Sequence, residues 1–208
     1  MEAGNKENIL EARQNTRQKK DGRWKMFLVI AICLAPVFAS YFTYYVIKPT
    51  ARTNYGELLD PRNYPMPQLD ATTMDGKPIN LDAYKGKWIL LQVDRGDCNK
   101  ACQDKLLDMR QLRLMQGKEM DRIERVWLIT DNTPLDTILM REYDGTHMLR
   151  VKPDPVTHWL PAQAGGTASD SIYIIDPVGN LMLRFPKNPD PYKMKKDIYK
   201  LLSASSIG

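Results

Sequence analysis

The feature that most constrains this sequence is an apolar run that ends in a turn and two cysteines. The run begins at Trp88 and breaks at Gly96, and Cys98 and Cys102 follow directly. After them, apolar side chains recur at steps of four and three, which marks one face of a helix. These positions are Cys102, Leu106, Met109, Leu112 and Met115. The sequence therefore predicts a buried strand, a tight turn, a thiol pair and a helix over 101–116.

The position of the two cysteines favours reactive sulfur chemistry. We expect Cys98 at or just before the helix N-terminus, where unpaired backbone N–H groups and the helix dipole favour a thiolate. Lys100 adds to this effect, whereas Asp97 opposes it. Cys98 is therefore the better candidate for the reactive sulfur, with Cys102 about one turn further on.

Three roles remain open for the pair. Cysteines four apart can form a disulfide if the first lies in the turn, because the Cβ atoms must approach to about 3.5–4.5 Å. The same pair, when reduced, offers two soft thiolates to one metal ion. In the third role, Cys102 packs in the core and Cys98 has no function. The third cysteine, Cys33, lies in an apolar segment and is expected to be a small apolar side chain there.

A second apolar run, Met26–Ile47, contains no charged residue. As a helix it is long enough to cross a hydrocarbon core of about 30 Å. Trp24 before it and Tyr44 and Tyr45 near its end fit the aromatic belts of membrane interfaces. A cleaved signal peptide is the alternative, but the run is longer than a typical signal-peptide core and no clean cleavage site follows it. We expect a single transmembrane helix over 26–47.

Charge predicts the orientation of this helix. The chain has a formal net charge of +5, and its first 25 residues are rich in basic side chains: Lys6, Arg13, Arg17, Lys19, Lys20, Arg23 and Lys25. Basic flanks stay in the cytoplasm. We therefore expect a cytoplasmic tail (1–25) and an external C-terminal domain, which in a bacterium means the inner membrane and the periplasm. The tail lacks the interleaved aromatics of a nucleic-acid-binding segment, so no nucleic-acid partner is expected.

The rest of the chain alternates strand and helix patterns. A proline-rich linker over 48–66 precedes a domain over 67–208, which opens with a hairpin over 68–81 closed by the turn at Asp75 and Gly76. Beyond the thiol pair we expect a strand over 125–130 and a helix over 135–142 capped by Asp131. The alternation indicates parallel strands. Residues 146–167 show no regular pattern, and a hairpin over 171–185 and a helix over 191–203 complete the chain.

Four local motifs accompany this order of elements: Asp75-Gly76-Lys77, Tyr84-Lys85-Gly86-Lys87-Trp88, Cys98-x-x-x-Cys102 and Asp176-Pro177-Val178-Gly179. With these motifs, the chain resembles the Sco/SenC family of membrane-anchored, thioredoxin-fold proteins. The resemblance implies an α/β thioredoxin-like fold, with a central mixed sheet flanked by helices and preceded by one transmembrane helix. It also implies a role in assembling the copper centre of cytochrome c oxidase, with an oxidase subunit or a copper carrier protein as partner.

The sequence departs from the family pattern at three positions. Asn99 and Gln103 stand where the family has prolines beside its cysteines, and Asp170 falls at the position of the family's copper-binding histidine. A carboxylate is a hard ligand that substitutes poorly for imidazole on Cu(I). Either of the two histidines, His147 or His158, could instead approach the thiols from the irregular segment, although their spacing forms no ligand pattern with the cysteines.

Three functions therefore compete. The preferred one is a Sco-like thiol-disulfide redox protein that assists oxidase assembly, in which Cys98 attacks and Cys102 resolves the mixed disulfide. The second is a copper chaperone that binds Cu(I) through Cys98 and Cys102, with Asp170, a histidine or the client as a further ligand. The third is a non-catalytic interaction module whose disulfide is a structural cross-link.

Overall fold

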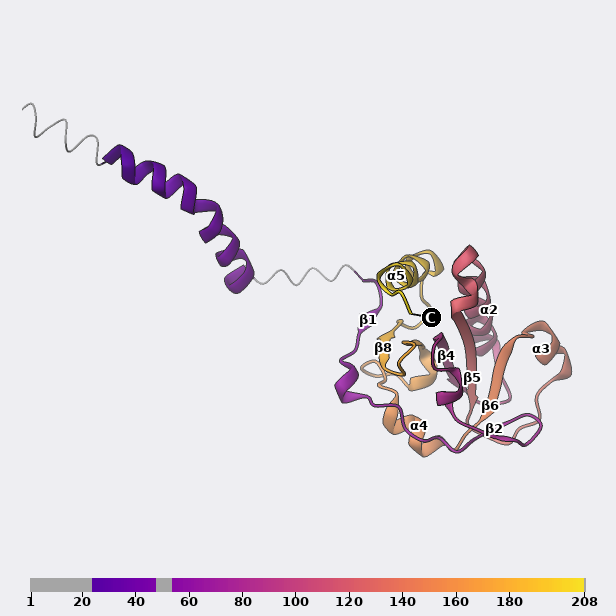
Figure 1. Cartoon of the computed structure of the whole chain (residues 1–208). Helices are drawn as coiled ribbons and strands as arrows, with labels where there is room; N and C mark the ends of the chain where they lie inside the picture. Colours follow the sequence, from indigo (N-terminus) through magenta and orange to yellow (C-terminus); the bar gives the residue numbers. More distant parts are fainter. Residues whose placement is uncertain (1–23, 48–53, 208) are drawn as a thin grey trace, which may run out of the picture. The chain divides into compact units, whose positions relative to one another are not determined.

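The computed structural model describes residues 24–47 and 54–207, which fall into two compact units. Residues 1–23 of the predicted tail and 48–53 of the predicted linker lie outside the described residues. The first unit contains one helix, Trp24–Val46, with a mean hydropathy of 2.2 (Figure 1). This helix is long and apolar enough to cross a membrane, and it coincides with the predicted span. Its final turn, η1, is a π-helix (Thr43–Ile47).

The second unit is built on an eight-stranded mixed sheet with the order β1-β8-β7-β4-β5-β6-β2-β3. The strands are β1 (Glu57–Leu58), β2 (Ala71–Thr73), β3 (Pro78–Ile79), β4 (Trp88–Asp94), β5 (Ile123–Ile129), β6 (Thr146–Arg150), β7 (Ile172–Ile175) and β8 (Leu181–Arg184). The three central strands β4, β5 and β6 are parallel, and β7 joins β4 in the antiparallel direction. The predicted α/β organisation with parallel strands is therefore confirmed.

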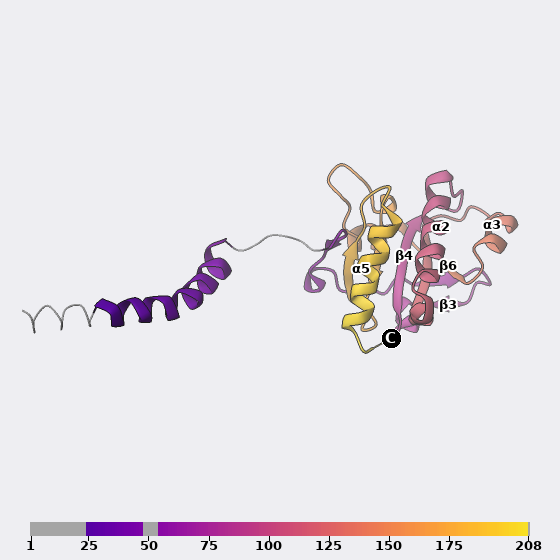
Figure 2. The ribbon, with the colours of Figure 1, turned by 90° about the horizontal axis from the view of Figure 1, so that it is seen from above.

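Helices cover both faces of the sheet. They are α2 (Lys100–Leu114), α3 (Thr137–Glu142), α4 (Pro153–Trp159) and α5 (Pro191–Ala204), with short 3-10 turns at η2 (Pro61–Asn63), η3 (Leu81–Tyr84), η4 (Gly117–Arg122) and η5 (Ala168–Asp170). Successive residues of β4 alternate between two cores, because side chains along a strand point to opposite faces. Leu90 packs with α2 and α5, whereas Leu91 packs with α4. Figure 2 shows α2 and α5 side by side over β4.

The structure corrects two local predictions. Residues 146–167 are not irregular, because they contain β6 and α4. The prolines that suggested a loop, Pro153 and Pro155, lie in the first turn of α4, where the missing N–H needs no partner. In addition, α3 begins at Thr137 and is capped by Asp136, whereas Asp131 makes contacts elsewhere.

Residues 54–66, which fall in the predicted linker, contain β1 and η2. β1 pairs antiparallel with β8. The Gly56 N–H donates to the buried Asp197 carboxylate of α5 at 2.8 Å. An added Cβ at Gly56 would meet the Leu183 side chain at 2.4 Å, so the close approach of this segment to β8 requires glycine. The second unit is thus packed from residue 54 onward.

Candidate functional site

Cys98 and Cys102 are joined by a disulfide at the start of α2. Their Cα atoms lie 5.2 Å apart. Cys98 lies just before Asn99, the N-cap of α2, whose side chain accepts a hydrogen bond from the Cys102 N–H at 3.1 Å. Both cysteines are buried, but Cys98 retains 7% exposure whereas Cys102 retains none. The structure therefore brings the two predicted cysteines together and leaves Cys98 as the less buried one.

The turn that delivers Cys98 packs tightly against the loop after β5. The Gly96 N–H donates to the Asp131 carboxylate at 2.8 Å. An added Cβ at Gly96 would lie 2.7 Å from the Thr133 carbonyl oxygen. This close backbone approach explains the glycine, and it gives Asp131 a role in shaping the turn instead of capping α3.

Asn99 and Gln103 stabilise the turn through hydrogen bonds. Asn99 caps α2, as described above, and Gln103 Nε2 donates to the Cys98 carbonyl oxygen at 3.0 Å. A proline side chain offers neither the capping oxygen nor the amide donor. Prolines at these two positions would therefore not supply the hydrogen bonds that hold this turn.

The charged residues around the disulfide pair with one another. Lys100 lies 2.9 Å from Asp104, and Arg95 lies 3.2 Å from Asp97. All four side chains are more than half exposed, so both pairs are weak. Asp104 partly neutralises the positive charge of Lys100, which was expected to favour a Cys98 thiolate. Arg95 likewise partly neutralises the opposing negative charge of Asp97.

A buried glutamine contacts the disulfide from the sheet. Gln92, in β4, is fully buried, and its Nε2 lies 3.3 Å from both the sulfur and the carbonyl oxygen of Cys102. Gln92 is not among the predicted site residues. Its only signal in the sequence is that it is the single amide in the apolar run that precedes the cysteines.

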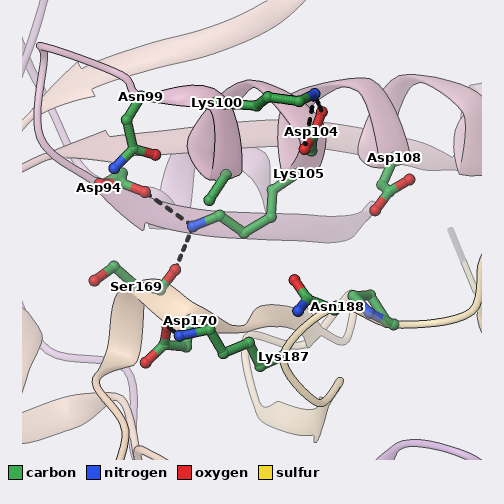
Figure 3. A pocket seen from close by; sticks show the side chains of 12 residues that line it. Asp94, Asn99, Lys100, Asp104, Lys105, Asp108, Ser169, Asp170, Lys187 and Asn188 are labelled. Atoms are coloured by element: carbon green, nitrogen blue, oxygen red, sulfur yellow. Dashed lines mark hydrogen bonds and ion pairs between the residues drawn. The ribbon is translucent and has the colours of Figure 1, made fainter.

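A polar cleft of about 600 Å³ lies beside the first turns of α2 (Figure 3). On one side, the Lys105 ammonium pairs with Asp94 at 2.9 Å and donates to the Ser169 carbonyl oxygen. On the other, Asp170 pairs with Lys187 at 2.8 Å. Asp170 and Lys187 thus lie on the side of the cleft opposite α2, as Figure 3 shows, and the Asp170 carboxylate is already engaged.

Two carboxyl groups of this cleft have shifted pKa values. The hydrogen bond from Lys187, with a further one from the Thr167 N–H, lowers the pKa of Asp170 to about 2. Burial, with the nearby charge of Asp104, raises the pKa of Asp108 to about 6. Asp170 is therefore firmly ionised, whereas Asp108 titrates in the range of mildly acidic solutions.

The two histidines lie away from the disulfide. His147 Nε2 is 3.1 Å from Glu124, and its ring packs at a tilt of 38° against Tyr84 with 4.4 Å between centroids. Tyr84 packs on the core opposite to that of the cysteines. His158 is exposed on α4, and its Nδ1 lies 2.7 Å from the Asp154 carbonyl oxygen. The structure does not bring either histidine to the thiols.

The residues present do not complete a copper site. Cys98 and Cys102 supply two soft donors when reduced, but Asp170 is a hard ligand held by Lys187. Among residues 24–47 and 54–207, no group of three or more His, Cys, Asp or Glu side chains is arranged to hold a metal ion. Among the described residues, no third His, Cys, Asp or Glu side chain is therefore grouped with the two cysteines.

Solved structures similar to this chain include members of the Sco/SenC family, as the sequence resemblance predicts. A SCO1/SenC family lipoprotein from Bacillus anthracis is 17% identical with a TM-score of 0.52, covering 70% of this chain and 97% of its own. Copper-bound ScoI from Arabidopsis thaliana is 15% identical with a TM-score of 0.53, covering 73% and 99%. BsSco, in which a disulfide switch is described, is 15% identical with a TM-score of 0.52, covering 70% and 98%.

At these identities the likeness establishes the fold. A comparison with curated proteins finds no match in sequence. A family model does match, over residues 88–205, which extend from the first residue of β4 to just beyond α5. This confirms the thioredoxin-like fold with one N-terminal candidate span. The chain belongs to the family whose description is "Transmembrane-like, thioredoxin-like, C-terminal domain".

Proposed function

We propose that this protein is a membrane-anchored, Sco-like thiol-disulfide redox protein that assists assembly of the copper centre of cytochrome c oxidase. The observation that carries the proposal is the disulfide at the N-terminus of α2, in which Cys98 retains slight exposure and Cys102 retains none. BsSco, which shares the fold, is described as a member of a family of cytochrome c oxidase assembly proteins and has a disulfide switch. The client is a thiol-bearing oxidase subunit or copper carrier protein.

The exposures of the two sulfurs assign their roles. In the reduced protein, the Cys98 thiolate attacks a client disulfide, and one client sulfur leaves as a thiolate. The buried Cys102 then attacks Cys98, which closes the internal disulfide and releases the second client thiol. The client gains the two electrons that the cysteine pair loses. A reductant must then reopen the Cys98–Cys102 disulfide. Its thiol attacks Cys98, because Cys102 is fully buried.

The apolar helix supports a single-pass anchor in a bacterial inner membrane. Its N-terminal flank is the more basic one, so the thioredoxin-like unit faces the periplasm. That compartment is oxidising, so the cysteine pair requires a reductant to remain active as a donor.

The test is a trapping experiment with single cysteine variants of the full chain, all made in a Cys33→Ser background. Cys102→Ser leaves the attacking sulfur without its resolving partner, so it should accumulate a mixed disulfide with the client on non-reducing gels. Cys98→Ser lacks the attacking sulfur and should trap nothing. Equal behaviour of the two variants, with no trapped client in either, would exclude the oxidoreductase function and leave the disulfide as a structural cross-link.

A second candidate function is Cu(I) binding by the reduced pair, because the fold is shared with copper-bound ScoI. The reduced full chain should be titrated with Cu(I) against a competing chelator, beside a Cys98→Ser/Cys102→Ser control. Tight binding of one equivalent that the control loses would support this function. Asp170→His should then raise the affinity if Asp170 occupies the position of the family's histidine, and an unchanged affinity would reject that positional match.

A further inference from the structure

Gln92 lies directly behind the disulfide and is the most unusual residue of β4. Its side chain faces α2, and its neighbours on the adjacent strands are Trp127 in β5 and Ile172 in β7. It is fully buried, and Nε2 lies 3.3 Å from Cys102 Sγ. Its other polar atom, Oε1, is buried and has no hydrogen-bond partner among the described residues. A buried amide with an unpaired oxygen costs stability, which raises the question of what Gln92 contributes in return.

The need for a donor at this point follows from the proposed chemistry. When a thiolate attacks Cys98, the electron pair of the S–S bond passes to the Cys102 sulfur. That sulfur is shielded from water, since Cys102 is fully buried, so solvent does not stabilise the charge. Two basic side chains of the same helix are already engaged: Lys105 by Asp94 and Ser169, and Lys100 by Asp104.

We propose that Gln92 donates the hydrogen bond that stabilises Cys102 as the sulfur that leaves when the disulfide opens. This inference rests on the proposed thiol-disulfide function. The step is R–S⁻ plus Cys98–S–S–Cys102 giving R–S–S–Cys98 plus the Cys102 thiolate. A second thiol of a dithiol reductant then displaces Cys98, so two electrons pass from the reductant to the pair.

The unpaired Oε1 of Gln92 also favours the reduced state of the cysteine pair. A disulfide sulfur is a weak acceptor, and a hydrogen bond to a thiolate is stronger. Once Cys102 carries a proton, a half-turn of the amide places Oε1 where it can accept the S–H. Both reduced forms of Cys102 are therefore better satisfied by Gln92 than the disulfide is. The residue favours opening of the disulfide in rate and in equilibrium.

The test compares Gln92→Met with a matched control, Gln116→Met. Gln116 lies just beyond the other end of α2, and it is likewise buried, with an unpartnered Oε1 and with Nε2 donating to the Leu112 carbonyl oxygen at 3.1 Å. Both variants remove a buried amide at similar side-chain length. The full chain, in detergent and in the Cys33→Ser background, is reduced with dithiothreitol to obtain a rate constant and equilibrated with glutathione buffers to obtain a redox equilibrium constant.

Gln92→Met should slow reduction and shift the equilibrium toward the disulfide, each about tenfold, the size expected for loss of a hydrogen bond to a charged group. Gln116→Met should match the parent chain in both. If Gln92→Met does not fold, Gln92→Asn withdraws the amide by one methylene and should move both constants in the same direction. Unchanged constants in the Gln92 variant, or equal changes in the Gln116 variant, would overturn the inference. These measurements need no client, so a failure to trap one would count against the proposed function alone.

Discussion

Two aspartates of the cleft beside α2 contribute opposite pH dependences to the stability of the fold. Asp170 has a pKa lowered to about 2 by Lys187, so its contribution to folding is complete above about pH 4 and is lost as the pH falls toward 2. Asp108 has a pKa raised to about 6 by burial, so the folded state holds its proton more tightly than the unfolded state. Its ionisation therefore destabilises the fold as the pH rises from about 4 to 6.

We predict that the two asparagine variants respond in opposite senses. In urea unfolding, the stability advantage of the parent chain over Asp170→Asn should shrink as the pH falls from 4 to 2. The stability of the parent chain relative to Asp108→Asn should decrease as the pH rises from 4 to 6. Differences that do not vary with pH across these windows would contradict the two environments described for the cleft.

At the same scale, the sequence predicts some site residues and not others. Cys98 and Cys102 are recognisable because their spacing and the helix that follows lie within one short stretch. Gln92 is near in sequence, but its contact with Cys102 depends on how α2 packs on β4. The contact of Asp131 with Gly96 joins segments 35 residues apart. No local pattern encodes that pairing, so the sequence suggested a helix cap instead.

At the scale of elements, the N-cap of α2 couples the stability of the helix to the geometry of the disulfide. We predict that Asn99→Ala lowers the free energy of unfolding by about 1 kcal/mol, the usual cost of losing an N-cap. The Cys102 N–H would lose its acceptor, which lies 3.1 Å away in the parent chain. Chemical denaturation of the oxidised protein measures this change.

Asp136→Ala provides the matched control for this prediction. The Asp136 side chain caps α3 by accepting from the Ile138 N–H at 2.8 Å, away from the cysteines. Asp136→Ala should lower the free energy of unfolding by a similar amount to Asn99→Ala. It should leave the rate of disulfide reduction unchanged. A loss of stability in Asp136→Ala with none in Asn99→Ala would contradict the importance of the cap at the thiol turn.

The long elements and the two hairpins with marked turns were predictable, whereas β1, β6 and α4 were not. The periodicity of α2 and α5 and the apolar runs of β4 and β5 reflect burial, which the sequence carries residue by residue. β6 and α4 are only 5 and 7 residues long, and prolines at the start of α4 resemble a loop. β1 has two residues and exists through its pairing with β8. Such elements depend on tertiary partners that a local pattern does not show.

At the scale of the whole molecule, the proposed function requires the disulfide-bearing unit to be exported. Two features support this proposed orientation: the basic residues gathered before the span, and the cysteine pair, which forms a disulfide in an oxidising compartment. The fold of the second unit does not itself set the orientation. The distribution of charge across the span is the physical cause that can be tested separately.

We predict that alkaline phosphatase, which is active only after export, is active in a bacterial host when fused after residue 208 and inactive when fused after residue 23. The control replaces Lys19, Lys20, Arg23 and Lys25 with glutamine, which weakens the charge difference between the flanks and should reduce the activity of the C-terminal fusion. Because this change leaves the thioredoxin-like unit intact, any loss reports on orientation and not on folding. An inactive C-terminal fusion in the parent chain would place the cysteine pair in the cytoplasm and remove the reason to propose a periplasmic client.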